Sequence, residues 1–129
     1  MVSLELIGEV PVVRKPIEAR LCPLAGAVEQ IGDGWMMMIL WTSYEGVTRF
    51  DDYQRQLGVA RNILSNRLRR LVELGILEKR PVRDGARRLE YRVTAKGEEL
   101  RAPLTEIRRW GNRWQPDAVA LDEMELVEV

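Results

Sequence analysis

The amino-acid sequence predicts a mainly α-helical domain with one small β-hairpin. Apolar residues recur at helical spacing over much of the chain between positions 22 and 114. Two short helical segments in this region are joined by a tight turn containing Gly58, which is typical of a helix-turn-helix. The pair Asp84-Gly85 follows between alternating apolar residues, and Asp-Gly is the strongest short hairpin signal. The resulting order of helix, helix, helix-turn-helix, hairpin and helix predicts a winged helix-turn-helix fold.

The domain organisation follows from length and periodicity. The 129 residues can bury one core but are too few for two domains. We expect residues 1–21 to form an N-terminal arm, with a short strand near Leu4 to Ile7. Residues 22–114 then form the winged helix-turn-helix domain, and residues 115–129 form an acidic C-terminal tail.

The sequence gives no sign of a membrane partner or of export. No apolar run approaches the roughly 18 residues that a membrane span needs. The N-terminus lacks the basic-then-apolar pattern of a signal peptide. We therefore expect a cytoplasmic protein.

Two helices are predicted before the helix-turn-helix. The pair Cys22-Pro23 opens the first, because proline suits the first helical turn, where its missing N–H is no loss. Three apolar residues then form an amphipathic stripe: Leu24, Val28 and Ile31. Asp33, between two glycines, is a candidate cap for the second helix. The apolar run Trp35–Trp41 contains one β-branched residue, which predicts a helix that is buried on most sides.

The first helix of the helix-turn-helix is expected after Gly46. Residues 47–49 are compatible with a short strand. Phe50, Tyr53 and Leu57 then repeat at i, i+3 and i+7, which predicts a short helix ending at Gly58.

The second helix is expected over about Ala60 to Leu74. Four apolar residues share one of its faces: Leu64, Leu68, Leu71 and Val72. Gly75 occupies the position where a left-handed residue ends many helices, and Ile76 supplies the apolar contact that accompanies such an ending.

A hairpin and a last helix complete the domain. Residues 77–79 and 89–93 alternate in polarity on either side of the turn at 83–87. Pro81 is compatible with an edge strand, and in a two-stranded wing both strands are edge strands. Thr94 is expected to cap one long final helix, which Pro103 bends. Its apolar stripe consists of five residues: Leu100, Leu104, Ile107, Trp110 and Trp114.

The charge is distributed unevenly although the whole chain is neutral. Residues 61–92 contain ten basic and four acidic side chains, a net charge of +6. Residues 115–129 contain five acidic side chains and no basic one, a net charge of −5. A basic block of this kind is typical of a polyanion-binding protein, and the alternative is a solvated, salt-bridged face.

The candidate DNA-binding residues lie within the basic block. Opposite the leucines of the second helix are side chains suited to base edges: Arg61, Asn62, Ser65, Asn66 and Arg69. The wing adds three basic residues placed for phosphates or the minor groove: Arg83, Arg87 and Arg88. Alternatively, the helix residues are only the solvent side of an amphipathic helix. The coincidence of turn, polar face, basic hairpin and local charge favours double-stranded DNA as the partner.

Other function classes have weaker support. The chain contains no histidine, which removes the commonest general base and metal ligand, and a single cysteine excludes a multi-cysteine metal site. There is also no glycine-rich phosphate loop, so we expect no enzyme, metal site or cofactor. The main alternative is a winged helix that serves as a protein–protein interaction module, because a fold alone does not decide its function. Structured RNA is a weaker alternative, since no aromatic platform is interleaved with the basic residues.

The same motifs resemble those of the HxlR-type winged-helix transcriptional regulators, within the MarR-like group. The resemblance covers roughly Cys22 to Trp114 and rests on six segments: 22–35, 49–52, 64–71, 75–77, 90–94 and 110–111. It implies a sequence-specific regulator that binds a palindromic operator as a homodimer built from the first and last helices. Two features depart from the family pattern. Ala60 replaces a common capping serine, and the sequence after Trp114 matches no family motif.

Cys22 is the candidate redox-sensing residue. In some members of this family a cysteine at this position senses electrophiles or oxidants. The start of a helix favours a thiolate because unpaired N–H groups point at it. The alternative is a buried, inert cysteine. A small-molecule effector is the other candidate signal. Its pocket would lie between the dimer helices and be lined by Trp35, Met36, Met37, Met38, Trp41, Trp110 and Trp114, although a Met and Trp stripe of this kind is more often plain core.

Overall fold

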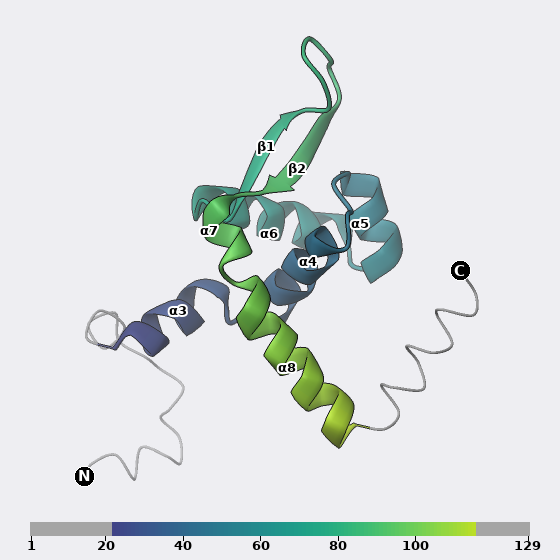
Figure 1. Ribbon diagram of the computed structural model, residues 1–129. Coiled ribbons are helices and arrows are strands. Elements are labelled where there is room, and N and C mark those ends of the chain that lie inside the picture. Colours follow the sequence, from purple (N-terminus) through teal and green to yellow (C-terminus); the bar gives the residue numbers. More distant parts are fainter. Residues whose placement is uncertain (1–21, 116–129) are drawn as a thin grey trace.

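The computed structural model describes residues 22–115 and has the predicted winged helix-turn-helix fold (Figure 1). Its elements are α3 (Pro23–Ile31), α4 (Gly34–Tyr44), α5 (Phe50–Leu57), α6 (Arg61–Glu73), β1 (Leu77–Pro81), β2 (Leu89–Val93), α7 (Ala95–Glu98) and α8 (Arg101–Trp114). The hairpin projects from one end of the helical body, and α8 leads away from the other. The proposed arm, with its strand near Leu4 to Ile7, and the tail beyond Gln115 lie outside the described residues. No helix within 22–115 is long and apolar enough to cross a membrane.

Helix α3 begins as predicted at Pro23, with Cys22 as its N-cap. The Cys22 Sγ accepts a hydrogen bond from the Ala25 N–H at 3.4 Å. None of the residues of α3 is buried, and Leu24 and Val28 of its apolar stripe are exposed. The predicted stripe therefore exists, but nothing within residues 22–115 covers most of it.

Helix α4 lies in the centre of the fold and contacts α3, α5, α6 and α8. Asp33 caps it as predicted: its Oδ1 accepts from the N–H of Trp35 at 2.8 Å and of Met36 at 3.2 Å. Met36, Ile39 and Leu40 are buried. The expectation of burial on most sides is wrong for Trp35 and Met38, which are exposed. Because every residue of this run is apolar, the sequence pattern did not indicate which side of the helix faces the core.

The helix-turn-helix consists of α5 and α6. Gly58 ends α5 in the left-handed conformation, with φ of 66°. Five side chains of this unit belong to the buried core: Tyr53, Val59, Leu64, Leu68 and Leu71. Burying a leucine side chain contributes about 1.5–3 kcal/mol, so the leucines of α6 fix its orientation against α4.

The end of α6 has the predicted geometry. Gly75 is left-handed with φ of 78°. The Ile76 N–H donates to the Leu71 carbonyl at 2.9 Å, and the Ile76 side chain is buried. This hydrogen bond satisfies a backbone carbonyl that the end of the helix would otherwise leave unpaired.

The segment before α5 differs from the prediction. Residues 47–49 form no strand. A single hydrogen bond, from the Tyr91 N–H to the Thr48 carbonyl at 2.8 Å, joins this segment to β2. One bond does not make a ladder, but it fixes the loop before α5 against the wing.

The wing is an antiparallel pair with Leu77 opposite Val93 and Pro81 opposite Leu89. Gly85 has φ of 80° at the turn, where the Ala86 N–H donates to the Arg83 carbonyl at 3.0 Å. The predicted hairpin and its Asp-Gly turn are thus confirmed.

The prediction of one long final helix is wrong. Thr94 caps only α7, its Oγ1 accepting from the Gly97 N–H at 3.1 Å, and the chain turns before α8 begins at Arg101. Pro103 lies in the first turn of α8, and it has no N–H to donate to the carbonyl of residue 99. The missing hydrogen bond accounts for a break, where the sequence suggested only a bend.

Candidate nucleic-acid interface

One face of α6 carries the predicted base-contacting residues, and all five of them are exposed: Arg61, Asn62, Ser65, Asn66 and Arg69. The leucines of the opposite face have no exposed surface. Within residues 22–115, the side chains of Asn62, Ser65 and Arg69 make no hydrogen bond or ion pair. Their polar groups are therefore available to a partner molecule.

Arg61 is held in place at the start of α6. Its guanidinium lies 4.6 Å from the centre of the Phe50 ring. Its Nη1 donates to Gln54 Oε1 at 3.1 Å and lies 3.6 Å from Asp51 Oδ1. Since Ala60 offers no side-chain cap, these contacts with α5, rather than a capping side chain, hold the entry to α6.

Asn66 is connected to the start of α4 through Arg67. The Arg67 Nη1 donates to Asn66 Oδ1 at 3.0 Å, and Nη2 donates to Asp33 Oδ2 at 3.0 Å. Hydrogen bonding to Arg67, together with the N–H of Met36 and Trp35, holds the pKa of Asp33 below its usual value despite some desolvation. The sequence identified Asp33 only as a helix cap, and this contact with α6 was missed.

The wing places its three predicted basic residues on the surface: Arg83, Arg87 and Arg88. Arg83 and Arg87 flank the turn, whereas Arg88 lies just before β2. Arg88 and Arg61 line the same cleft between the wing and the helix-turn-helix. The structure thus brings one predicted wing residue together with one predicted helix residue.

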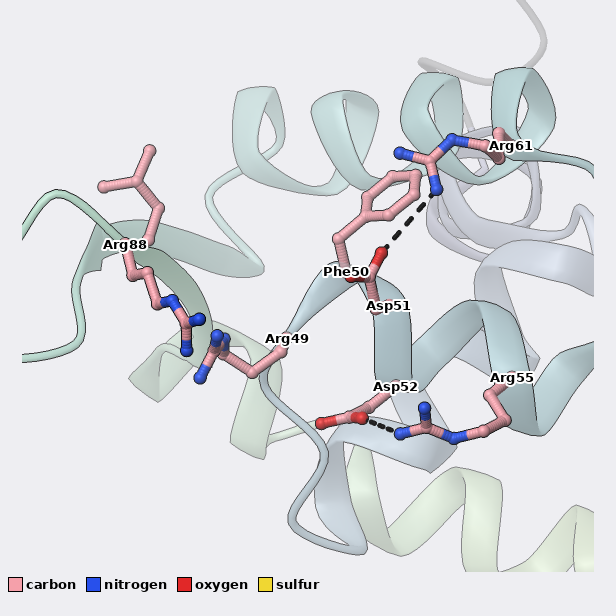
Figure 2. A pocket seen from close by; sticks show the side chains of 8 residues that line it. Arg49, Phe50, Asp51, Asp52, Arg55, Arg61 and Arg88 are labelled. Atoms are coloured by element: carbon pink, nitrogen blue, oxygen red, sulfur yellow. Dashed lines mark hydrogen bonds and ion pairs between the residues drawn. The ribbon is translucent and has the colours of Figure 1, made fainter.

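That cleft has a volume of about 500 Å³. Eight residues line it: Arg49, Phe50, Asp51, Asp52, Arg55, Arg61, Arg88 and Leu89 (Figure 2). Arg55 is paired with Asp52, and Arg61 is paired with Asp51. Arg49 and Arg55 were not among the predicted site residues, because both precede the basic block at 61–92.

The predicted redox residue lies on a different element. Cys22 is exposed at the start of α3 and lines neither the cleft nor the α6 face. Within the described part of the chain, no group of three or more cysteine or acidic residues is arranged to hold a metal ion.

Exposed apolar side chains also lie on α3 and α8. The predicted stripe on the last helix divides in two: Leu104 is only 7% exposed and belongs to the core, whereas Ile107, Trp110 and Trp114 are 54%, 59% and 66% exposed. Leu24 and Val28 of α3 are also exposed. These five residues of α3 and α8 are called the apolar face below.

Comparison with known protein families finds one matching model. The model described as HxlR-like helix-turn-helix matches residues 30–119, which include α4 through α8. The segments that suggested this resemblance in the sequence lie mostly within the matched range.

Two curated proteins illustrate the relatives. The uncharacterized HTH-type transcriptional regulator MT3179 of Mycobacterium tuberculosis (strain CDC 1551 / Oshkosh) is 40% identical over 90 residues, which cover 70% of this chain and 57% of that protein. The uncharacterized HTH-type transcriptional regulator YvaP of Bacillus subtilis (strain 168) is 28% identical over 99 residues, covering 75% of this chain and 92% of that protein. The match thus spans little more than half the length of the mycobacterial relatives.

Two solved structures illustrate the fold. PA1607, a candidate transcription factor, superposes with a TM-score of 0.69 at 46% identity, covering 73% of this chain and 66% of that chain. The redox regulator HypR in its reduced form superposes with a TM-score of 0.66, covering 75% of this chain and 99% of that chain. HypR is only 23% identical, so its likeness concerns the fold alone.

Proposed function

Because this chain belongs to the HxlR-like helix-turn-helix family, we propose that it is a transcriptional regulator that binds double-stranded DNA in a sequence-specific manner. The observation that carries the proposal is the exposed polar face of α6 beside a basic wing, because three side chains of that face, Asn62, Ser65 and Arg69, have no partner within residues 22–115. Relatives named as HTH-type transcriptional regulators support it. No catalytic activity is part of the proposal.

The proposed mode of binding places α6 in the major groove. In helix-turn-helix proteins, the N-terminal part of the second helix contacts base edges. Asn62 and Asn66 can pair with adenine edges, and Arg69 can pair with guanine. Arg83 and Arg87 at the turn of the wing then contact phosphates or the minor groove.

We further propose a homodimer that binds a palindromic operator. The apolar face on α3 and α8 exposes Trp110 and Trp114, and an exposed apolar surface of this kind marks an interaction site. A second copy of the chain is the proposed cover, because a two-fold dimer presents two α6 helices to successive half-sites.

The domain boundaries and the effector belong to the same proposal. Residues 22–114 form the DNA-binding and dimerisation unit, with 1–21 as an arm and 115–129 as an acidic tail.

Cys22 is the proposed site of a response to oxidants, since it is exposed and its Sγ accepts a backbone N–H. A regulator of this kind is proposed to act in the cytoplasm.

Substitutions on α6 and on the wing should have different effects. Asn62→Ala removes a base-reading amide, so we expect a loss of about 1–3 kcal/mol of binding free energy and a relaxed base preference at one position. Arg61→Ala should act similarly, although it also removes the contact with Phe50. Arg87→Ala and Arg88→Ala remove phosphate contacts, so binding to all sequences should weaken and the salt dependence should flatten. Gel shifts with the intergenic DNA beside the gene, and with point variants of that duplex, measure both effects.

The control is Arg109→Ala, which removes a basic side chain from α8 at an exposed position. Its affinity for DNA should equal that of the parent. If the α6 and wing variants also retain parental affinity and base preference, the proposed interface is wrong.

A further inference from the structure

Two arginine side chains from distant parts of the sequence converge at the cleft beside α5. Arg49 lies directly before α5 and Arg88 lies directly before β2. Figure 2 shows their guanidinium groups pointing toward each other. Within residues 22–115, neither makes a hydrogen bond or ion pair with another side chain, whereas Arg55 and Arg61 of the same cleft are each paired with an aspartate. The cleft therefore holds two positive charges that no acidic side chain of residues 22–115 pairs with.

The backbone on both sides of this arginine pair is fixed. The Thr48 carbonyl accepts the Tyr91 N–H at 2.8 Å, which ties the segment before α5 to β2. The Arg49 carbonyl accepts the N–H groups of Asp52 at 3.0 Å and Tyr53 at 3.1 Å, as the first bonds of α5. The two like charges repel each other, and an anion placed between them would convert this repulsion into attraction.

We propose that Arg49 and Arg88 together bind one phosphate group of the DNA backbone. The planar arrangement of N–H donors in arginine matches the oxygens of a phosphate and allows two parallel hydrogen bonds from each side chain. The two aspartates of the cleft do not compete for these arginines, because Arg55 and Arg61 occupy them. The cleft lies between α6 and the wing, the two elements that are proposed to contact DNA.

This assignment rests on the proposed function, since it adds a backbone contact to the same interface. It also gives Arg49, which lies outside the basic block, a defined role: it fixes the position of the duplex without reading its sequence. A free molecule that carries a phosphate group would be bound by the same hydrogen bonds. The experiment must therefore distinguish such a molecule from the DNA backbone.

The test measures the affinity of the full chain for duplex DNA over a range of salt concentrations. Arg49→Ala should weaken binding to every duplex roughly tenfold and lower the slope of log affinity against log salt by about one unit. Base preference should not change. Arg49→Lys keeps the charge but not the paired donors, so it should restore most of the slope and only part of the affinity.

The matched control is Arg55→Ala, which removes an arginine from the same cleft that is already paired with Asp52. It should leave the slope unchanged. In the double variant of Arg49 and Arg88, the fold-loss of DNA affinity should differ from the product of the two single fold-losses, because residues that share one ligand are coupled. Thermal unfolding of each variant checks that the fold is retained, and Arg88→Ala on the exposed wing provides a second probe if Arg49→Ala does not fold.

Three results would overturn the assignment. The first is a slope of log affinity against log salt that equals the parental slope in both Arg49→Ala and Arg88→Ala, while Asn62→Ala still changes base preference. The proposed function would then stand, but this phosphate site would not. The second is a double variant whose loss equals the product of the single losses, which means two separate phosphates. The third is binding of inorganic phosphate, measured by calorimetry, that requires Arg49 in a protein that does not bind duplex DNA. That result would assign the site to a free phosphate-bearing ligand and would also contradict the proposed function.

Discussion

At the scale of single residues, Cys22 combines exposure with a position at the start of a helix. It is the single cysteine of the chain, so any disulfide must join two chains or capture a small thiol. Because α3 contributes to the apolar face, modification there would, in the proposed homodimer, alter how two protomers pack and therefore how their α6 helices are spaced. We expect diamide to change the affinity of the parent for its DNA. The DNA affinity of Cys22→Ser should not change with diamide.

Gel shifts with and without diamide, combined with mass spectrometry of the thiol, test this prediction. Unchanged affinity after complete modification of Cys22 would show that the thiol does not regulate DNA binding. An unreactive thiol would identify it as a packing residue instead.

The sequence predicted single residues well where the signal was local. The exposure of Asn62, Ser65 and Asn66 follows from their helical spacing opposite the leucines. Contacts between distant segments were not predictable in this way. The pairing of Asp33 with Arg67 and the approach of Arg49 to Arg88 both depend on how α6 and the wing pack on the rest of the domain. Periodicity specifies which face of a helix is buried, but it does not specify which charged groups meet across a tertiary contact.

At the scale of elements, the contact between Asp33 and Arg67 joins the start of α4 to α6. Asp33→Asn keeps an oxygen that can cap α4 but removes the carboxylate that pairs with Arg67. Since both side chains are partly exposed, we expect a loss in the free energy of unfolding of no more than about 1 kcal/mol at pH 7.

The pH dependence of this loss has a defined sign. The pKa of Asp33 is lowered in the folded protein, so its contribution to stability is present above the pKa of the unfolded chain and disappears as the pH falls through the folded value. Urea unfolding at pH 7 and at pH 3 should therefore show the parent and Asp33→Asn converging in acid. A difference that is equally large at both pH values would mean that the charge of Asp33 is not what stabilises the contact.

Elements with strong end signals were predicted within about one residue. Gly58 and Gly75 end α5 and α6 in the left-handed conformation as expected, and the Asp-Gly turn forms the wing. The two errors arose where local signals were ambiguous. Residues 47–49 have strand-like composition but only one backbone partner, at Thr48, and Pro103 breaks the last helix instead of bending it.

At the scale of the whole molecule, the apolar face is where we propose that a second copy packs. Leu104 is part of the core of one protomer, so an aspartate there would unfold the domain and reveal nothing about a dimer. Ile107 is 54% exposed on the same helix and is the better probe. We expect Ile107→Asp to remain helical but to become monomeric, because it would place an unpaired charge in the interface.

Sedimentation velocity of the parent, Ile107→Asp and the control Ala102→Asp measures this effect. Ala102 is also exposed on α8 but lies outside the apolar face, so its variant should remain dimeric. A dimeric Ile107→Asp protein would place the interface elsewhere, and a monomeric parent would contradict the homodimer.

The central claim is that the α6 face and the wing bind double-stranded DNA, and the salt dependence of duplex binding by the parent tests it most directly. A dimer whose basic residues neutralise about six to ten phosphates should lose roughly 10³–10⁵-fold in affinity between 50 and 200 mM salt, with a linear plot of log affinity against log salt. That steep, linear fall is the predicted result. An absence of binding at low salt, or an affinity that does not change with salt, would contradict the claim and favour a winged helix that binds another protein.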